Sequence, residues 1–173
     1  MEDTMRKGWI LAVLGIVCAC ASTGDTKEME LDDAIELASS DINDTLSAGT
    51  KVALLNFSSS SDVFSDYVLE EISIHLVRGK KLVVVDRREM ELIRGEMDFQ
   101  MSGDVSDESA QQIGKMLGAQ SIVSGSLVFM GEDYRFRTKV INVNTAAIET
   151  SLSVIVWDDR QIQHLLNQGR RNP

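Results

Sequence analysis

The two cysteines of this 173-residue sequence, Cys18 and Cys20, carry its most reactive side chains and lie two positions apart. A disulfide between them would close a very small, strained ring. A metal site would also be incomplete, because two thiolates without a neighbouring histidine do not fill a tetrahedral shell. The spacing therefore favours neither redox nor metal chemistry, and the residues around the pair have to decide its role.

An apolar stretch, Trp9–Val17, comes directly before the cysteines and after the basic residues Arg6 and Lys7. It is too short for a membrane-spanning helix, which needs about 20 apolar residues, and it is typical of a secretory signal peptide. We therefore divide the chain into a lipoprotein signal peptide (1–19), a short polar tether (20–30) and a folded domain (31–173).

Cys20 has the neighbours that a bacterial lipobox requires, with the aliphatic Val17 three positions before it and the small Ala19 directly before it. Cys18 fits this pattern less well, so we predict that Cys20 carries the lipid and that Cys18 is removed with the signal peptide. The alternative is ordinary signal-peptide cleavage at Ala19-Cys20-Ala21.

The residues after the predicted lipidation site bear on location and reach. Ala21 and Ser22 stand where an aspartate would favour retention in the inner membrane of enteric bacteria, so the sequence favours the periplasmic face of the outer membrane. Ser22–Glu30 is polar, and ten extended residues span at most about 35 Å. A protein anchored there reaches only partners near that membrane.

Two polar groups of residues are candidate binding sites. Ser58, Ser59, Ser60 and Ser61 lie between a predicted strand and a predicted helix, where backbone N–H groups can bind an anion; the alternative is a solvated loop that caps the helix. Arg135, Arg137 and Lys139 alternate along one predicted strand and so share a face. This basic face predicts contact with an acidic partner or an anionic envelope polymer, unless it is an ordinary solvent face or is covered by the first acidic helix.

Composition and the remaining reactive residues limit the function. A net charge of −10 disfavours nucleic-acid binding and favours a monomeric or weakly associating surface over a ring. His75 and His164 are the only histidines, and His75 fits a helix surface. No glycine-rich phosphate loop follows a strand, so we expect no enzyme, no metal and no cofactor.

Hydrophobic periodicity predicts one α/β domain. The expected helices are 31–46 (before Gly49), 62–78 (ending at Gly79), 104–117 (capped near Asp104 or Ser106) and 159–166. A further helix is expected to begin at Asp86, with a capping box to Glu89 and with Met90, Leu92 and Ile93 pointing inward. The expected strands are 51–57, 81–85, 121–130, 134–143 and 147–157. The order predicts a mixed five-stranded sheet flanked by helices, with a parallel crossover followed by an antiparallel C-terminal hairpin.

The register of that hairpin follows from its polarity. If Val143 faces Ala147, then Phe136 faces Val154, and one face of the hairpin is mostly apolar. Arg137 and its basic neighbours then lie on the other face beside serines. A slip by one residue would mix the two faces.

Several segments in succession resemble the CsgG-like superfamily of curli-secretion lipoproteins, which includes the LpoB-like activators of penicillin-binding proteins. They are KVALLNF (51–57), KLVVVDRREMELI (81–93), DESAQQIGKMLGAQSIVSGSL (107–127) and KVINVNTAAIETS (139–151). The resemblance covers residues 31–157, and Ala146-Ala147 replaces the glycine that is usual at the last turn.

The resemblance implies a non-enzymatic, lipid-anchored periplasmic protein that acts by protein–protein contact. The leading hypothesis is a regulator of a peptidoglycan synthase, that is, of a penicillin-binding protein. The first alternative is a subunit or accessory of a curli-type secretion complex, although the sequence has no spare pair of long hairpins. The second is a periplasmic ligand-binding domain that uses the Ser58–Ser61 loop.

Overall fold

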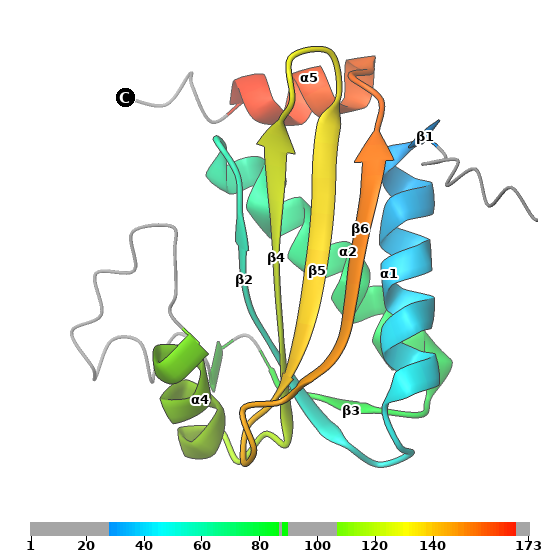
Figure 1. The fold of residues 1–173 in the computed structure, drawn as a ribbon. Helices are drawn as coiled ribbons and strands as arrows, with labels where there is room; N and C mark the ends of the chain where they lie inside the picture. Colours follow the sequence, from blue (N-terminus) through cyan, green and yellow to red (C-terminus); the bar gives the residue numbers. More distant parts are fainter. Residues whose placement is uncertain (1–27, 87, 90–106, 169–173) are drawn as a thin grey trace, which may run out of the picture.

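The computed structural model describes residues 28–86, 88–89 and 107–168. Its elements, labelled as in Figure 1, are β1 (Glu28–Met29), α1 (Leu31–Thr45), β2 (Lys51–Ser58), α2 (Asp62–Gly79), β3 (Val83–Val84), α4 (Asp107–Met116), β4 (Ser121–Phe129), β5 (Tyr134–Asn142), β6 (Ile148–Val156) and α5 (Arg160–Gln168).

The strands form one mixed sheet in the order β1-β6-β5-β4-β2-β3 (Figure 1). Strand β2 pairs in parallel with both β3 and β4, whereas β4, β5 and β6 are antiparallel. The predicted fold class is confirmed, with one strand more than expected. The extra strand is β1, which pairs in parallel with the end of β6 and lies in the segment interpreted as tether.

The main core lies between the sheet and helices α1 and α2, and α2 runs behind the strands in Figure 1. In α1 the buried residues recur at helical spacing, which places one apolar stripe against the sheet: Leu31, Ala34, Ile35, Ala38 and Ile42. Phe57 sits at the centre, with its ring centroid 6.1 Å from that of Phe64 and 5.2 Å from that of Phe136.

A second, smaller core lies on the opposite face, where α4 covers one end of the sheet. Its buried members include Leu55, Ile113, Leu117 and Ile122. Gly114 lets α4 approach closely, because a Cβ there would lie 2.6 Å from atoms of Ile122 and Val143. The rest of this face is not covered by any helix within the described part of the chain.

One predicted strand was too long, because β3 comprises only Val83–Val84, whereas 81–85 was expected. The predicted end of α2 at Gly79 is confirmed, and the residue after it, Lys80, takes the left-handed conformation (φ 54°). Packing accounts for the glycine itself, since a Cβ on Gly79 would lie 3.1 Å from the side chain of Asn43. Gly49, with φ +81°, lies in the turn beyond Thr45.

The predicted helix start at Asp86 is confirmed in part, because its carboxylate accepts the backbone N–H of Arg88 at 2.8 Å. The reciprocal bond from Glu89 is not found among the described residues. The other expected residues of this helix and the expected caps of the next fall outside the described residues: Met90, Leu92, Ile93, Asp104 and Ser106.

The predicted hairpin register is confirmed from Tyr134↔Val156 through Val140↔Thr150. Next to the turn it was wrong, because a bulge shifts the pairing and Ile141 lies opposite Ile148. The carboxylate of Glu149, beside the bulge, accepts hydrogen bonds from Ser121 Oγ at 2.6 Å and Asn142 Nδ2 at 3.1 Å. These two bonds stabilise the shifted register.

Tyr67 joins α1, α2 and α5 at one end of the core. Its hydroxyl donates to Asp32 Oδ1 at 3.1 Å and accepts from Gln161 Nε2 at 3.2 Å. Burial, and next the bond to Asp32, raise the pKa of Tyr67 from 10.0 to about 12. The fold therefore favours the neutral phenol.

We expect a loss of stability at high pH that depends on Tyr67. Because the pKa is higher in the folded state, this contribution is complete below pH 10.0 and is lost as the pH rises to about 12. Denaturant titrations of wild type and Tyr67→Phe should show a difference that shrinks across that interval. A difference independent of pH would contradict the assignment.

Candidate functional site: the open face of the sheet

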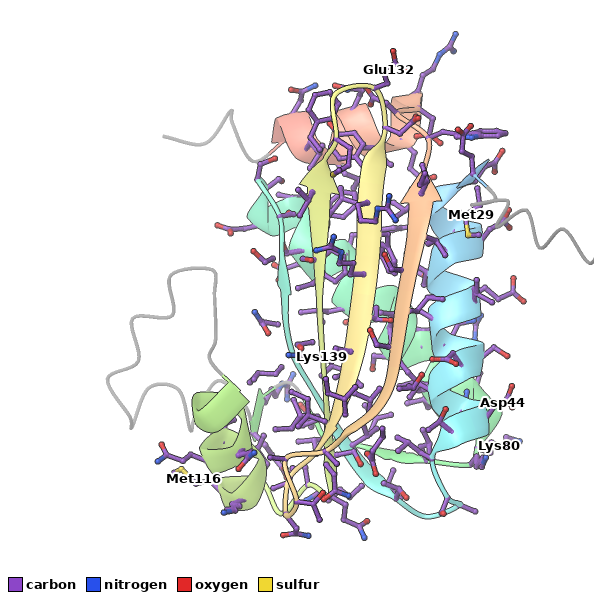
Figure 2. The ribbon with its side chains drawn as sticks, in the orientation of Figure 1. Met29, Asp44, Lys80, Met116, Glu132 and Lys139 are labelled. Carbon is purple, nitrogen blue, oxygen red and sulfur yellow. The ribbon has the colours of Figure 1, made fainter. Side chains whose placement is uncertain are left out.

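The candidate site is the part of the sheet that no described helix covers, which we name the open face. It is opposite α1 and α2 and is formed by alternate residues of three antiparallel strands: Ser124, Ser126 and Val128 of β4, Arg135, Arg137 and Lys139 of β5, and Ser151, Ser153 and Ile155 of β6. Figure 2, in which Lys139 is labelled, looks onto this face.

The pairing places the basic residues in three rungs across the open face. Lys139 lies between Ser124 and Ser151, and Arg137 between Ser126 and Ser153. Residues directly opposite each other in an antiparallel pair share a face, so each of these two cations has a hydroxyl on either side.

The third rung differs in chemistry, because Arg135 lies between the apolar Val128 and Ile155. The guanidinium Nε of Arg135 is buried and has no hydrogen-bond partner among the described residues. The open face is therefore polar and basic along most of its length and apolar toward the β4–β5 turn.

A groove of about 420 Å³ runs along β4 on this face. Its lining comes from four strands: Asn56, Ser58, Ser124, Gly125, Ser126, Val128, Arg137, Thr138, Lys139 and Ser151. None of these residues is acidic, although the whole chain has a net charge of −10. The groove is thus a local basic surface on an acidic protein.

The structure places the predicted basic residues together on one face, as expected, and that face is not the one covered by the first acidic helix. Sequence reasoning missed the β4 serines, Ser124 and Ser126. Their alternation in SIVSGSL (121–127) was a signal, but the strand expected there was assigned no polar face.

The second predicted group, Ser58–Ser61, is split by the structure. Ser58 reaches the groove at the end of β2. Ser59 donates to the carbonyl of Ser61 at 2.7 Å and lies 2.9 Å from Ser65 Oγ. Ser60 is exposed. The loop therefore does not present four hydroxyls to one ligand.

Ser61 is buried and joins two helices. Its hydroxyl accepts the N–H of Phe64 at 3.3 Å as the N-cap of α2, and donates to the carbonyl of Leu165 in α5 at 2.9 Å. The helix-capping interpretation of the loop thus accounts for this serine, and the same side chain holds α5 against α2.

We expect Ser61→Ala to lower the free energy of unfolding by about 2 kcal/mol, because it removes a cap and leaves a carbonyl unpaired. Urea denaturation measures the loss. The exposed neighbour gives the matched control, since Ser60→Ala should stay within about 0.5 kcal/mol of wild type. Equal stability of the two variants would contradict the capping role.

The other reactive residues form no cluster in the described part of the chain. His75 is half-buried on α2 and His164 is exposed on α5. Among the described residues, no group of three histidine, cysteine or acidic side chains is placed to hold a metal ion. Cys18 and Cys20 lie outside those residues, and no helix within them is long and apolar enough to cross a membrane.

The fold and the open face define a class of one-domain α/β proteins in which helices cover one face of a mixed sheet and leave most of the other face open. The chain belongs to the CsgG family: the family model for the curli production assembly/transport component CsgG matches residues 27–151. No curated protein sequence matches the chain.

Solved structures share this fold at low sequence identity. The C-terminal domain of LpoB from Salmonella enterica is 15% identical with a TM-score of 0.61, covering 72% of this chain and 96% of that domain. LpoB from Escherichia coli is 12% identical with a TM-score of 0.58, covering 90% and 80%. Lipoprotein GNA1162 from Neisseria meningitidis is 8% identical with a TM-score of 0.51, covering 72% and 98%.

Proposed function

We propose that this protein is anchored by a lipid on Cys20 to the periplasmic face of the outer membrane. From there it regulates an envelope enzyme by direct contact, without catalysis of its own, and the partner is a penicillin-binding protein. The CsgG family and the fold shared with LpoB support this role. The single observation that carries it is the groove of the open face, which is basic on an acidic chain.

The charge of the groove is complementary to that of an acidic partner. Arg137 is exposed and Lys139 is half-buried, and both line a groove without acidic residues. A partner surface rich in carboxylates is attracted to such a groove, while the negative remainder of the protein repels it and so restricts docking to this face. The open face therefore serves as the docking surface.

The test is binding of a purified penicillin-binding protein from the same organism to the full chain. We expect Arg137→Glu/Lys139→Glu to weaken binding by about a hundredfold, because attraction at two positions becomes repulsion. Biolayer interferometry measures the affinity, and the effect should shrink as salt is added.

A matched control carries the same charge change elsewhere. Arg78 and Lys80 are exposed at the end of α2, so Arg78→Glu/Lys80→Glu should bind almost as wild type does. Equal loss in both variants would mean that net charge alone governs binding, and the open face would not be the docking surface.

The secretion-complex alternative makes a different physical prediction. A subunit of such a complex assembles into a closed ring, whereas the regulator is a monomer. Native mass spectrometry of the full chain separates the two, and a closed ring would overturn the proposal.

A further inference from the structure

We propose that the groove of the open face binds an extended acidic segment of the partner, with carboxylates on alternate residues facing Lys139 and Arg137. This inference rests on the proposed function and specifies the form of the partner at the same surface. The inference depends on how neighbouring strands form the groove. Their arrangement determines the width of the groove, its polarity from end to end and the spacing of its charges.

The groove has a low floor between two sides. Ser124 and Ser126 of β4 form the floor, with Gly125 between them. Lys139 and Arg137 of β5 stand along one side, directly opposite the two serines. Long cationic side chains beside short hydroxyl side chains leave the hollow that the groove occupies.

The other side of the groove comes from β2, because Asn56 pairs with Ser124 and Ser58 with Ser126. Both residues line the groove. The groove thus has cations on one side and an amide and a hydroxyl on the other.

The width of the groove selects the conformation of the bound segment. At the Arg137 rung the groove lies between β2 and β5, which are separated by two strand spacings, or about 10 Å between their backbones. At the Lys139 rung its lining extends to Ser151 of β6. An α-helix with its side chains is about 10–12 Å across, so it does not enter between side chains that rise from strands this close. A single extended chain does.

The spacing of the cations then selects the sequence of the segment. Lys139 and Arg137 are two residues apart on one strand, which is about 7 Å. Side chains two residues apart in an extended ligand have the same separation and point to the same side. Alternate carboxylates therefore match the two cations, and the intervening side chains face Asn56 and Ser58.

The apolar end of the groove determines which residue of the bound segment follows the two acidic ones. Val128 lines the groove where the floor reaches the third rung, and Ile155 flanks Arg135 in that rung. Val128 is 43% exposed, so an apolar side chain of the ligand placed here would remove apolar surface from water. From Ser124 toward Val128 along β4, the bound segment therefore has an acidic residue, any residue, a second acidic residue, any residue and an apolar residue.

The test uses labelled synthetic peptides and the full chain. The probe is the hexapeptide Glu-Ser-Glu-Ser-Leu-Ser, and the control is Glu-Glu-Ser-Ser-Ser-Leu, which has the same composition without the alternation. We expect the alternating peptide to bind at least about fivefold more tightly by fluorescence polarisation at low salt. Equal binding of the two peptides, or no binding of either, would overturn the inference.

One rung of the sheet offers a matched pair of variants. Ser126 is in the floor of the groove, and Ser153 lies across Arg137 on the other side, outside the groove lining. We expect Ser126→Trp to fill the groove and weaken the alternating peptide by about tenfold, with Ser153→Trp within about twofold of wild type. The smaller, uncharged pair Ser126→Leu and Ser153→Leu should give the same contrast by bulk, and it keeps the test valid if the tryptophan variant does not fold.

Three further outcomes separate the possible failures. If an anionic sugar polymer, oligogalacturonate, displaces the peptide at equal charge concentration, the groove recognises negative charge alone and the inference of a polypeptide ligand is wrong. If the penicillin-binding protein binds wild type but the order of the peptide has no effect, the inference fails and the proposed function stands. If the penicillin-binding protein does not bind wild type, the proposed function itself fails.

Discussion

Gly125→Ala is expected to lower the free energy of unfolding by about 3 kcal/mol, because the added methyl group has no room. A Cβ at this position would lie 2.6 Å from Cδ2 of Phe57 and 2.7 Å from the backbone oxygen of Arg137. Real Cβ contacts are longer than this, so either the Phe57 ring or strand β5 has to move.

Neither neighbour can move without cost. Phe57 is buried, and its ring packs against Phe64 and Phe136 in the main core. The Arg137 oxygen belongs to the backbone of β5, which is paired along both edges. Close-packed interiors transmit such a displacement to their neighbours, so the groove should be distorted together with the core.

Urea denaturation measures this effect, and a neighbouring position supplies the control. Ser126→Ala removes one oxygen atom from the same strand and adds no contact, so its stability should stay within about 0.5 kcal/mol of wild type. If Gly125→Ala also stays within that range, both the Phe57 ring and the backbone of β5 can move aside, and the close contact does not require glycine at this position.

Cys20→Ala is expected to move nearly all of the protein from the membrane fraction to the soluble fraction, because it removes the predicted attachment site of the lipid. The matched control is Cys18→Ala, which should stay in the membrane fraction. Fractionation of cells with an immunoblot measures both, and the opposite pattern would show that Cys18 is the lipidated residue.

The position of β1 shortens the maximum distance between the proposed lipid anchor and the folded domain. The sheet begins at Glu28, whose carboxylate accepts the indole N–H of Trp157 at 2.8 Å. From Cys20 to Glu28 there are eight residue steps, which span at most about 28 Å, compared with about 35 Å for a tether that continues to Glu30. The proposed partner surface must therefore lie close to the membrane that holds the anchor.

Local sequence patterns predicted much of this fold. The helical spacing of Leu31, Ile35 and Ile42 predicted α1 and its buried stripe. The alternation of Arg135, Arg137 and Lys139 with apolar residues predicted the hairpin register and the shared basic face. These features depend on residues near one another in the chain, whose periodicity matches a helix or a strand.

Contacts between distant parts of the chain were not predictable in this way. Strand β1 is two residues long and forms because Glu28 and Met29 lie beside the end of β6. Ser61 binds a carbonyl 104 positions further along the chain. The bulge near Glu149 depends on Ser121 in another strand.

The sequence by itself determined the order of most elements, the class of fold and the line of cations along β5. Only the tertiary structure decided that this line forms one side of a groove, because the groove needs Ser124 and Ser126 beside it and Asn56 and Ser58 across from it. Strand order brings those residues together, and strand order follows from how the sheet buries its apolar faces, which no single strand encodes.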